Sequence, residues 1–191
     1  TDIVIPSRYN GLPVTSIGEN AFSWKREIIS VTILDGVTKI ENDAFAGCLS
    51  LVSITIPESL TSIADCAFDC CLSLVEICNK SSLNFTAGSF DYGYIAWNAK
   101  NIITDESDSL IDVVGDYVFY VDGTEVYLLK YTGTDTEINI PEYVGAKTYV
   151  INAVAFINTS IDHIDIPDFV TDIGNYAFAN CTSLTTFEYW R

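Results

Sequence analysis

The sequence has no methionine, one histidine and few cations. It has nine Lys and Arg residues and 26 Asp and Glu residues, so the formal net charge is −17. Proteins that bind nucleic acid or an anionic membrane surface need clustered Lys and Arg, and this balance argues against both partners. The acidity favours solubility, with a cationic or Ca²⁺-rich environment as the alternative interpretation. No apolar run reaches the ~18 residues of a membrane-spanning helix, so no membrane insertion is expected.

The motifs that usually carry catalysis are also missing. His163 is the only histidine, and there is no Gly-x-Ser-x-Gly, His-Glu-x-x-His or P-loop motif. A nucleophile–His pair would have to be built around this one residue. A zinc site is not expected either, because no Cys-x₂-Cys pair repeats and there is a single His. The sequence therefore predicts no enzymatic activity, no cofactor and no metal site.

What the sequence does contain is a repeat. An Ala-Phe pair follows an aliphatic run five times, and the steps from Phe22 to Phe45 and from Phe45 to Phe68 are both 23 residues. The remaining pairs are Ala155-Phe156 and Ala177-Phe178. A fixed period in this range is typical of a solenoid, in which stacked units present an extended surface rather than a catalytic pocket.

Each repeat predicts the same local structure. The alternating Leu-Val-Ser-Ile-Thr-Ile of residues 51–56 has the period of a strand with one buried face. Pro57 then ends the strand, because proline cannot donate to a strand ladder. No segment is long enough for a long helix, and we expect a single helical turn around each Ala-Phe pair. Stacked units would form a parallel sheet with a rise of ~4.8 Å per repeat.

These motifs carry a family resemblance. Residues 56–63 read Ile-Pro-Glu-Ser-Leu-Thr-Ser-Ile, followed by Ala67-Phe68 and by Cys-Leu-Ser-Leu at 71–74, and residues 168–184 match equally well. This pattern resembles the BspA-type leucine-rich repeat, the 23-residue class also called treponemal. The predicted fold is a leucine-rich-repeat solenoid, right-handed and curved, with a parallel β-sheet face, short strands and single helical turns. The resemblance further implies an extracellular or cell-surface bacterial protein.

The repeat pattern fails between residues 93 and 135. Asp122-Gly123 lies between two runs of β-branched and aromatic residues, which predicts an antiparallel hairpin within 110–135 that interrupts the solenoid. The polar stretch 104–109 is expected to be an exposed loop. The predicted organisation is one continuous domain, with about four repeats in 1–92, the last of them degenerate, and about two in 136–191. Both ends fall in mid-pattern, so we expect a piece of a longer array.

Three of the six cysteines belong to the repeat. Cys48, Cys71 and Cys181 each follow a repeat Phe by three residues, where a small buried side chain would pack near the turn. Stacked in register they would lie about one strand spacing apart, whereas a disulfide needs Cβ atoms ~3.8 Å apart. We therefore expect free thiols at these positions. A disulfide from Cys78 to a neighbouring cysteine stays open.

Two surfaces are candidates for binding. The first is the outward row of the parallel sheet, which alternation places on its open face: Ser30, Thr32, Ser53, Thr55, Glu76, His163, Asp165, Thr186 and Glu188. The second is an aromatic cluster near the break in the pattern, in which rings could stack on sugars or anchor a protein: Tyr92, Tyr94, Trp97, Tyr117 and Tyr120. The alternatives are a merely solvated sheet face for the first and core packing for the second.

The resulting hypothesis is a non-catalytic recognition or adhesion module of a secreted or cell-surface bacterial protein, with a host protein or glycan as ligand. The recognition role follows from the solenoid geometry, and the adhesive role is implied by the resemblance. Two alternatives remain. The chain could be a structural spacer, or it could be a carbohydrate-binding accessory module of a secreted glycan-degrading protein.

Overall fold

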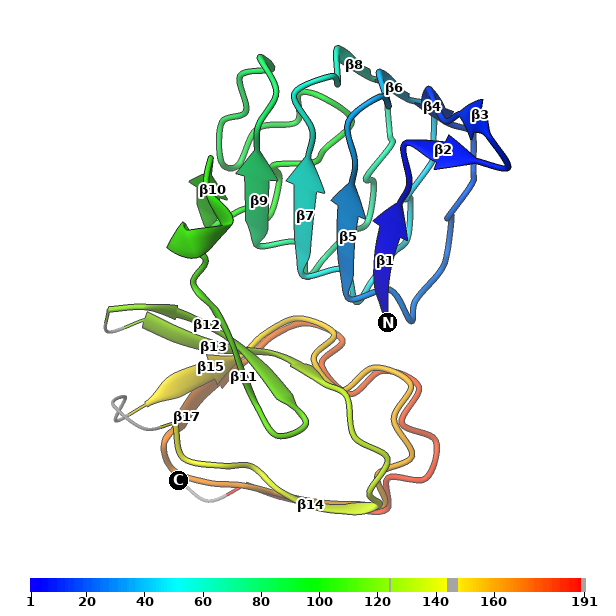
Figure 1. Cartoon of the computed structure of the whole chain (residues 1–191). Helices are drawn as coiled ribbons and strands as arrows, with labels where there is room; N and C mark the ends of the chain where they lie inside the picture. The colour runs from blue at the N-terminus through cyan, green and yellow to red at the C-terminus, as the bar shows by residue number, and fades with distance from the viewer. Residues whose placement is uncertain (124, 144–147, 190–191) are drawn as a thin grey trace. The chain divides into compact units, whose positions relative to one another are not determined.

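The computed structural model describes residues 1–123, 125–143 and 148–189, with the backbone alone at 188–189 (Figure 1). Residue contacts divide the chain into two compact units, Thr1–Ser109 (unit 1) and Leu110–Arg191 (unit 2).

Unit 1 is built around a parallel sheet of five strands. Their order is β1 (Asp2–Ile5), β5 (Ser30–Ile33), β7 (Ser53–Ile56), β9 (Glu76–Asn79) and β10 (Asn101–Ile103) (Figure 1). All four pairings are parallel, as the repeat predicts. Strand β10 extends this sheet into the segment 93–135, where irregular structure was expected.

Each coil returns through a second, narrower sheet. Strands β4 (Ser16–Ile17), β6 (Lys39–Ile40) and β8 (Ser62–Ile63) pair in parallel, one two-residue strand from each of the first three coils. The first coil also has a short antiparallel hairpin of β2 (Arg8–Tyr9) and β3 (Leu12–Pro13). The solenoid fold class is thereby confirmed, with its strands short and its only helix among the described residues a 3-10 turn, η1 (Glu106–Asp108).

The Ala-Phe segments are chains of tight turns rather than the predicted helical turns. Ala44 N–H donates to the carbonyl of Glu41 and Cys48 N–H to that of Phe45, both i→i−3. A helix cannot continue there because the backbone is left-handed on both sides of the repeat Phe. Positive φ occurs two residues before the Phe at Asn20, Asp43, Cys66, Val154 and Tyr176, and two residues after it at Trp24, Gly47, Cys70, Asn158 and Asn180.

This left-handed backbone gives a stability prediction at Tyr176, which is exposed and has φ 60°. Glycine adopts such a conformation without the Cβ clash that other residues suffer. We expect Tyr176→Gly to be more stable than Tyr176→Ala by about 1 kcal/mol, because both variants lose the ring but only alanine keeps the strain. Thermal unfolding of the two variants measures the difference. Equal melting temperatures would show that this turn is not strained.

The repeat phenylalanines form the predicted column. The rings of Phe22, Phe45 and Phe68 stack with centroids 5.1 Å apart at both steps. Backbone bonds link the same turns, since Phe22 N–H donates to Ala44 O and Phe45 N–H to Ala67 O. Neighbouring coils are therefore held by ring stacking and by hydrogen bonds at the same place.

The cysteine column is confirmed and has a defined role. The Sγ–H groups of Cys48 and Cys71 donate to the carbonyls of Phe22 and Phe45, both at 3.2 Å, and Cys181 donates to Phe156 at 3.1 Å. All six cysteines are free, including Cys78. Burial raises the pKa of Cys48 to about 11, so this thiol stays protonated at neutral pH.

Unit 2 repeats the same coil with a different start. Its parallel sheet consists of β14 (Glu137–Asn139), β16 (His163–Ile166) and β18 (Thr186–Tyr189). A second sheet has the order β11 (Ile111–Val114), β12 (Tyr117–Asp122), β13 (Glu125–Tyr131), β15 (Tyr149–Ile151) and β17 (Val170–Ile173). Strands β11, β12 and β13 are antiparallel neighbours, which confirms the predicted hairpin and adds a third strand to it.

The hairpin is part of the repeat array. Strand β13 pairs in parallel with β15, and Tyr131 then takes the place of the repeat Phe. Its N–H donates to Ala155 O, as Phe156 N–H donates to Ala177 O, and its ring lies 5.8 Å from that of Phe156. The hairpin thus forms the first coil of unit 2 instead of interrupting the array.

Candidate functional site

The outward row of unit 1 lies on one face of its five-stranded sheet. The strand register aligns Asp2, Ser30, Ser53, Glu76 and Asn101 in one line. It aligns Val4, Thr32, Thr55, Cys78 and Ile103 in a second line beside the first. The residues between them, such as Val31 and Ile54, are buried in the core. The structure therefore brings together the five residues of the predicted outward row that belong to this unit: Ser30, Thr32, Ser53, Thr55 and Glu76.

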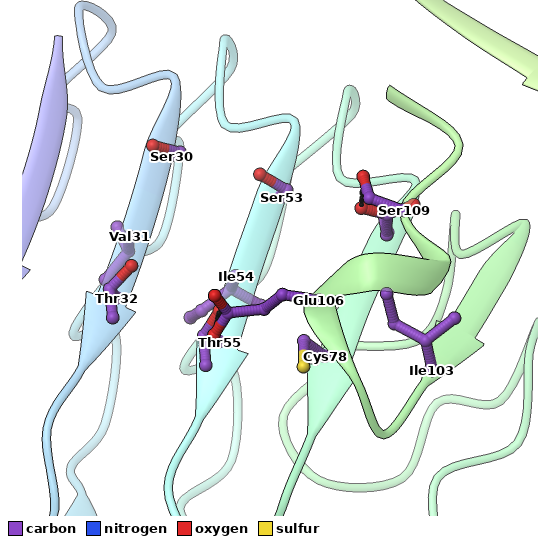
Figure 2. A pocket seen from close by; sticks show the side chains of 11 residues that line it. Ser30, Val31, Thr32, Ser53, Ile54, Thr55, Cys78, Ile103, Glu106 and Ser109 are labelled. Carbon is purple, nitrogen blue, oxygen red and sulfur yellow. Dashed lines mark hydrogen bonds between the residues drawn. The ribbon is translucent and has the colours of Figure 1, made fainter. Parts of the chain in front are cut away.

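These residues line a hollow of about 220 Å³. Its floor is the sheet, Ile103 of β10 included, and one wall comes from Glu106 and Ser109. Figure 2 shows the side chain of Glu106 reaching from η1 across the sheet toward Thr55. Thr55 Oγ1 donates to Glu106 Oε1 at 3.5 Å, so the wall touches the hydroxyl row directly.

Several interactions hold this wall in place. Asp105 caps η1, where its Oδ1 accepts from the N–H of Ser107 at 2.9 Å and from its hydroxyl at 2.8 Å. These bonds lower the pKa of Asp105. Glu106 Oε1 lies 2.8 Å from Lys80 Nζ. The sequence predicted only an exposed loop here. The Asp-x-Ser capping pattern was the available signal for a turn. No local pattern indicated that this turn would lie over the sheet.

Glu76 differs from the rest of the predicted row. It is only 5% exposed and accepts hydrogen bonds from Ser109 Oγ at 2.6 Å and from Asn101 Nδ2 at 3.0 Å. Its carboxylate is thus engaged within the protein and ties the wall to the sheet. We correct its predicted role from a ligand contact to a positioning residue.

The chemistry of the hollow is that of hydroxyls and carboxylates. Five hydroxyl side chains line it, together with the carboxylates of Glu76 and Glu106, and its lining includes no aromatic or Arg side chain. Asp2 lies beside it, accepting from Ser30 Oγ at 2.6 Å. Lys80 is the cation paired with Glu106. Such a surface accepts hydrogen bonds and attracts positive charge.

The outward row of unit 2 is shorter. His163 aligns with Glu137 and Thr186, and Asp165 aligns with Asn139 and Glu188. His163 Nε2 lies 3.3 Å from Asp165 Oδ1, and both side chains are substantially exposed. The side chain of Glu188 lies outside the described residues. The exposed side chain of His163 therefore lies beside the carboxylate of Asp165.

The predicted aromatic cluster is not one patch. Tyr92 packs against the core of unit 1, with its ring edge-on to Phe85 at 5.3 Å. Tyr117 and Tyr120 belong to unit 2, where Tyr120 is buried and Tyr117 packs on Tyr131 at 5.1 Å. Tyr92 and Tyr120 are corrected to packing residues, because the hairpin and the fourth coil need apolar rings to cover them.

Tyr94 and Trp97 remain at the surface of unit 1. Phe90 of the same aromatic cluster contacts both rings, lying 5.6 Å from Tyr94 and 4.0 Å from Trp97 between ring centroids.

The described residues contain no group of three His, Cys, Asp or Glu side chains placed to hold a metal ion. Within the same residues, no helix has the length and apolar character needed to cross a membrane.

Comparison with known proteins agrees with the coil geometry. The BspA type leucine rich repeat region matches in six copies, over residues 15–139 and 130–190. No curated protein matches the chain.

Solved structures offer distant likenesses. The chain is similar to a leucine rich cell surface protein from Faecalibacterium prausnitzii A2-165, with 20% identity and a TM-score of 0.42 over 98% of this chain and 69% of that one. A leucine rich repeat protein from T. pallidum has 22% identity and a TM-score of 0.40 over 98% and 68%. The pneumococcal vaccine antigen PcpA has 18% identity and a TM-score of 0.45 over 98% and 60%. Because the six repeat copies span more than half of its length, the chain belongs to the BspA-type leucine-rich repeat family.

Proposed function

We propose that this chain is a non-catalytic recognition module that binds its partner on the outward sheet face of unit 1. The observation that carries the proposal is the hollow lined by Ser30, Thr32, Ser53 and Thr55, with Glu106 as its wall. Solenoids commonly bind along such a sheet, and these side chains are not needed by the core. The wall adds a shaped, acidic feature that a plain solvated sheet would lack.

The family supports a location for this activity. The BspA-type repeats occur in bacterial cell-surface proteins, and we extend an extracellular or cell-surface location and an adhesive role to this chain. The partner we propose is a protein that offers Lys or Arg side chains, because the hollow presents hydroxyls and the carboxylate of Glu106, with Asp2 beside it. Binding should then weaken as the salt concentration rises.

The test is binding of the purified chain to immobilised extracellular-matrix proteins. Thr55→Arg places a long cation inside the hollow and should weaken binding at least about tenfold. Thr61→Arg is the matched control, since it makes the same change in the same coil at an exposed residue outside the hollow. It should bind like the wild type.

Two results would contradict the proposal. Equal binding by Thr55→Arg and the wild type would place the interface elsewhere. Absence of binding to every matrix protein would favour the structural spacer, which needs no contact on this face.

A further inference from the structure

We infer that the fourth coil of unit 1 carries a separate carbohydrate-binding site formed by Phe90, Tyr94 and Trp97. These three residues form an aromatic platform. The inference is independent of the hollow on the sheet, because none of the three lines it.

The platform rings are not required by the core. The interior of the fourth coil is filled by Ile95 and Ala96, both buried, with Phe85 packed beside them. In the two preceding coils the same kind of turn exposes polar or small residues, such as Asn42 and Asp69. Phe90 is instead 60% exposed and Trp97 44% exposed. A single exposed ring such as that of Trp24 is ordinary on a protein surface, but Phe90 and Trp97 are exposed and stacked together, which points to a ligand.

The three rings hold one another in fixed orientations. Phe90 and Trp97 stack with centroids 4.0 Å apart and planes 21° from parallel. Tyr94 meets Phe90 edge-on at 5.6 Å and 83°. The turn itself is closed by a bond from Trp97 N–H to Tyr94 O. Rings oriented in this way lose little side-chain entropy when a ligand binds.

A polar group suited to sugar hydroxyls lies within the same turn. Asp91 is exposed, and its Oδ2 accepts from Ser89 Oγ at 2.7 Å while its N–H donates to that hydroxyl at 3.0 Å. A fixed carboxylate accepts hydrogen bonds from hydroxyls, and the positive C–H groups on one face of a sugar ring pack on the negative face of an aromatic ring. The turn therefore offers both contacts that a saccharide needs.

The size of the patch favours a sugar over a protein partner. The exposed rings lie within residues 90–97, and two exposed charged residues, Asp91 and Lys100, lie within and just after this segment in the sequence. A stable protein interface buries about 800 Å² on each partner, which a single turn does not provide. One or two sugar rings fit such a platform. The negative charge of the chain does not repel a neutral glycan.

The experiment is an NMR titration of the ¹⁵N-labelled chain with neutral oligosaccharides, namely cellohexaose, xylohexaose, laminarihexaose, maltohexaose and chitohexaose. At least one should shift the Trp97 indole N–H signal and the amides of 90–97 in a saturable way. Trp97→Ala should weaken that binding at least about tenfold. Trp24→Ala is the matched control, because Trp24 is also an exposed indole of unit 1, with the guanidinium of Arg26 5.6 Å from its ring.

Phe90→Ala is a second variant at a more exposed ring, and circular dichroism checks that both variants remain folded. Saccharide binding that survives Thr55→Arg would separate this site from the hollow. The inference is overturned if no oligosaccharide shifts these signals, or if Trp24→Ala weakens binding as much as Trp97→Ala. Self-association of the wild type that Trp97→Ala abolishes would also overturn it, since the platform would then be a protein interface.

Discussion

Replacing Phe45 with alanine is expected to lower the free energy of unfolding of unit 1 by about 4 kcal/mol. The side chain is fully buried, and its ring is stacked between those of Phe22 and Phe68 at 5.1 Å on each side. Truncation leaves a cavity and removes two aromatic pairs, each worth about 0.5–1.5 kcal/mol beyond burial. A domain of ordinary stability would lose a large part of its total.

Phe22→Ala is the control, because Phe22 ends the column with one stacked neighbour and is partly exposed. We expect it to cost about half as much as Phe45→Ala. Urea unfolding monitored by circular dichroism and by the fluorescence of Trp24 and Trp97 measures both variants. Equal costs for the two would mean that stacking within the column does not determine stability.

The column was predictable because a repeat specifies its own contacts. Residues 23 positions apart become neighbours, so Phe45 must meet Phe68 and Cys48 must lie beside Cys71 once the units stack. The outward direction of Ser53 and Thr55 follows from strand alternation in the same way. These parts of the site depend only on local pattern and period.

The remaining parts of the site depend on contacts that the period does not encode. The sequence gives no reason for Glu106 to lie over Thr55, 51 residues away. Tyr131 replaces a repeat Phe without an Ala before it, so the motif could not reveal its place in the column. Tyr120 and Trp97 are both aromatic residues near the break, and only tertiary packing makes the first buried and the second exposed.

Lys130→Met is expected to raise the free energy of unfolding of unit 2 at pH 7. Lys130 is 9% exposed, and its Nζ donates to the carbonyl of Ile157 at 3.4 Å. Burial lowers the pKa of this ammonium from 10.5 to about 8, partly offset by Cys181. The shift corresponds to about 3 kcal/mol of unfavourable charge burial. Methionine keeps an unbranched stem in the same space and removes the charge.

The pH dependence of the free energy of unfolding tests whether charge burial is the cause of this gain in stability. Between pH 8 and 10.5 the unfolded state holds the lysine proton and the folded state has lost it, so the contribution of Lys130 to stability rises with pH across this window. Below pH 8 both states are protonated and the cost is present in full. The advantage of Lys130→Met should therefore be largest at pH 7 and should disappear above pH 10.5.

Urea unfolding of the wild type and the variant at both ends of this window gives the measurement. Other groups titrate equally in both proteins, so their effect drops out of the difference in free energy of unfolding. Tyr117 is one such group, and burial raises its pKa to about 12. Lys39→Met, at an exposed lysine, is the control and should change stability by no more than about 0.5 kcal/mol. An equal gain for Lys130→Met at both pH values would identify packing as its source. A loss of stability at pH 7 would instead mean that the hydrogen bond to Ile157 outweighs the cost of burying the charge, and that the lysine stabilises the first coil of unit 2.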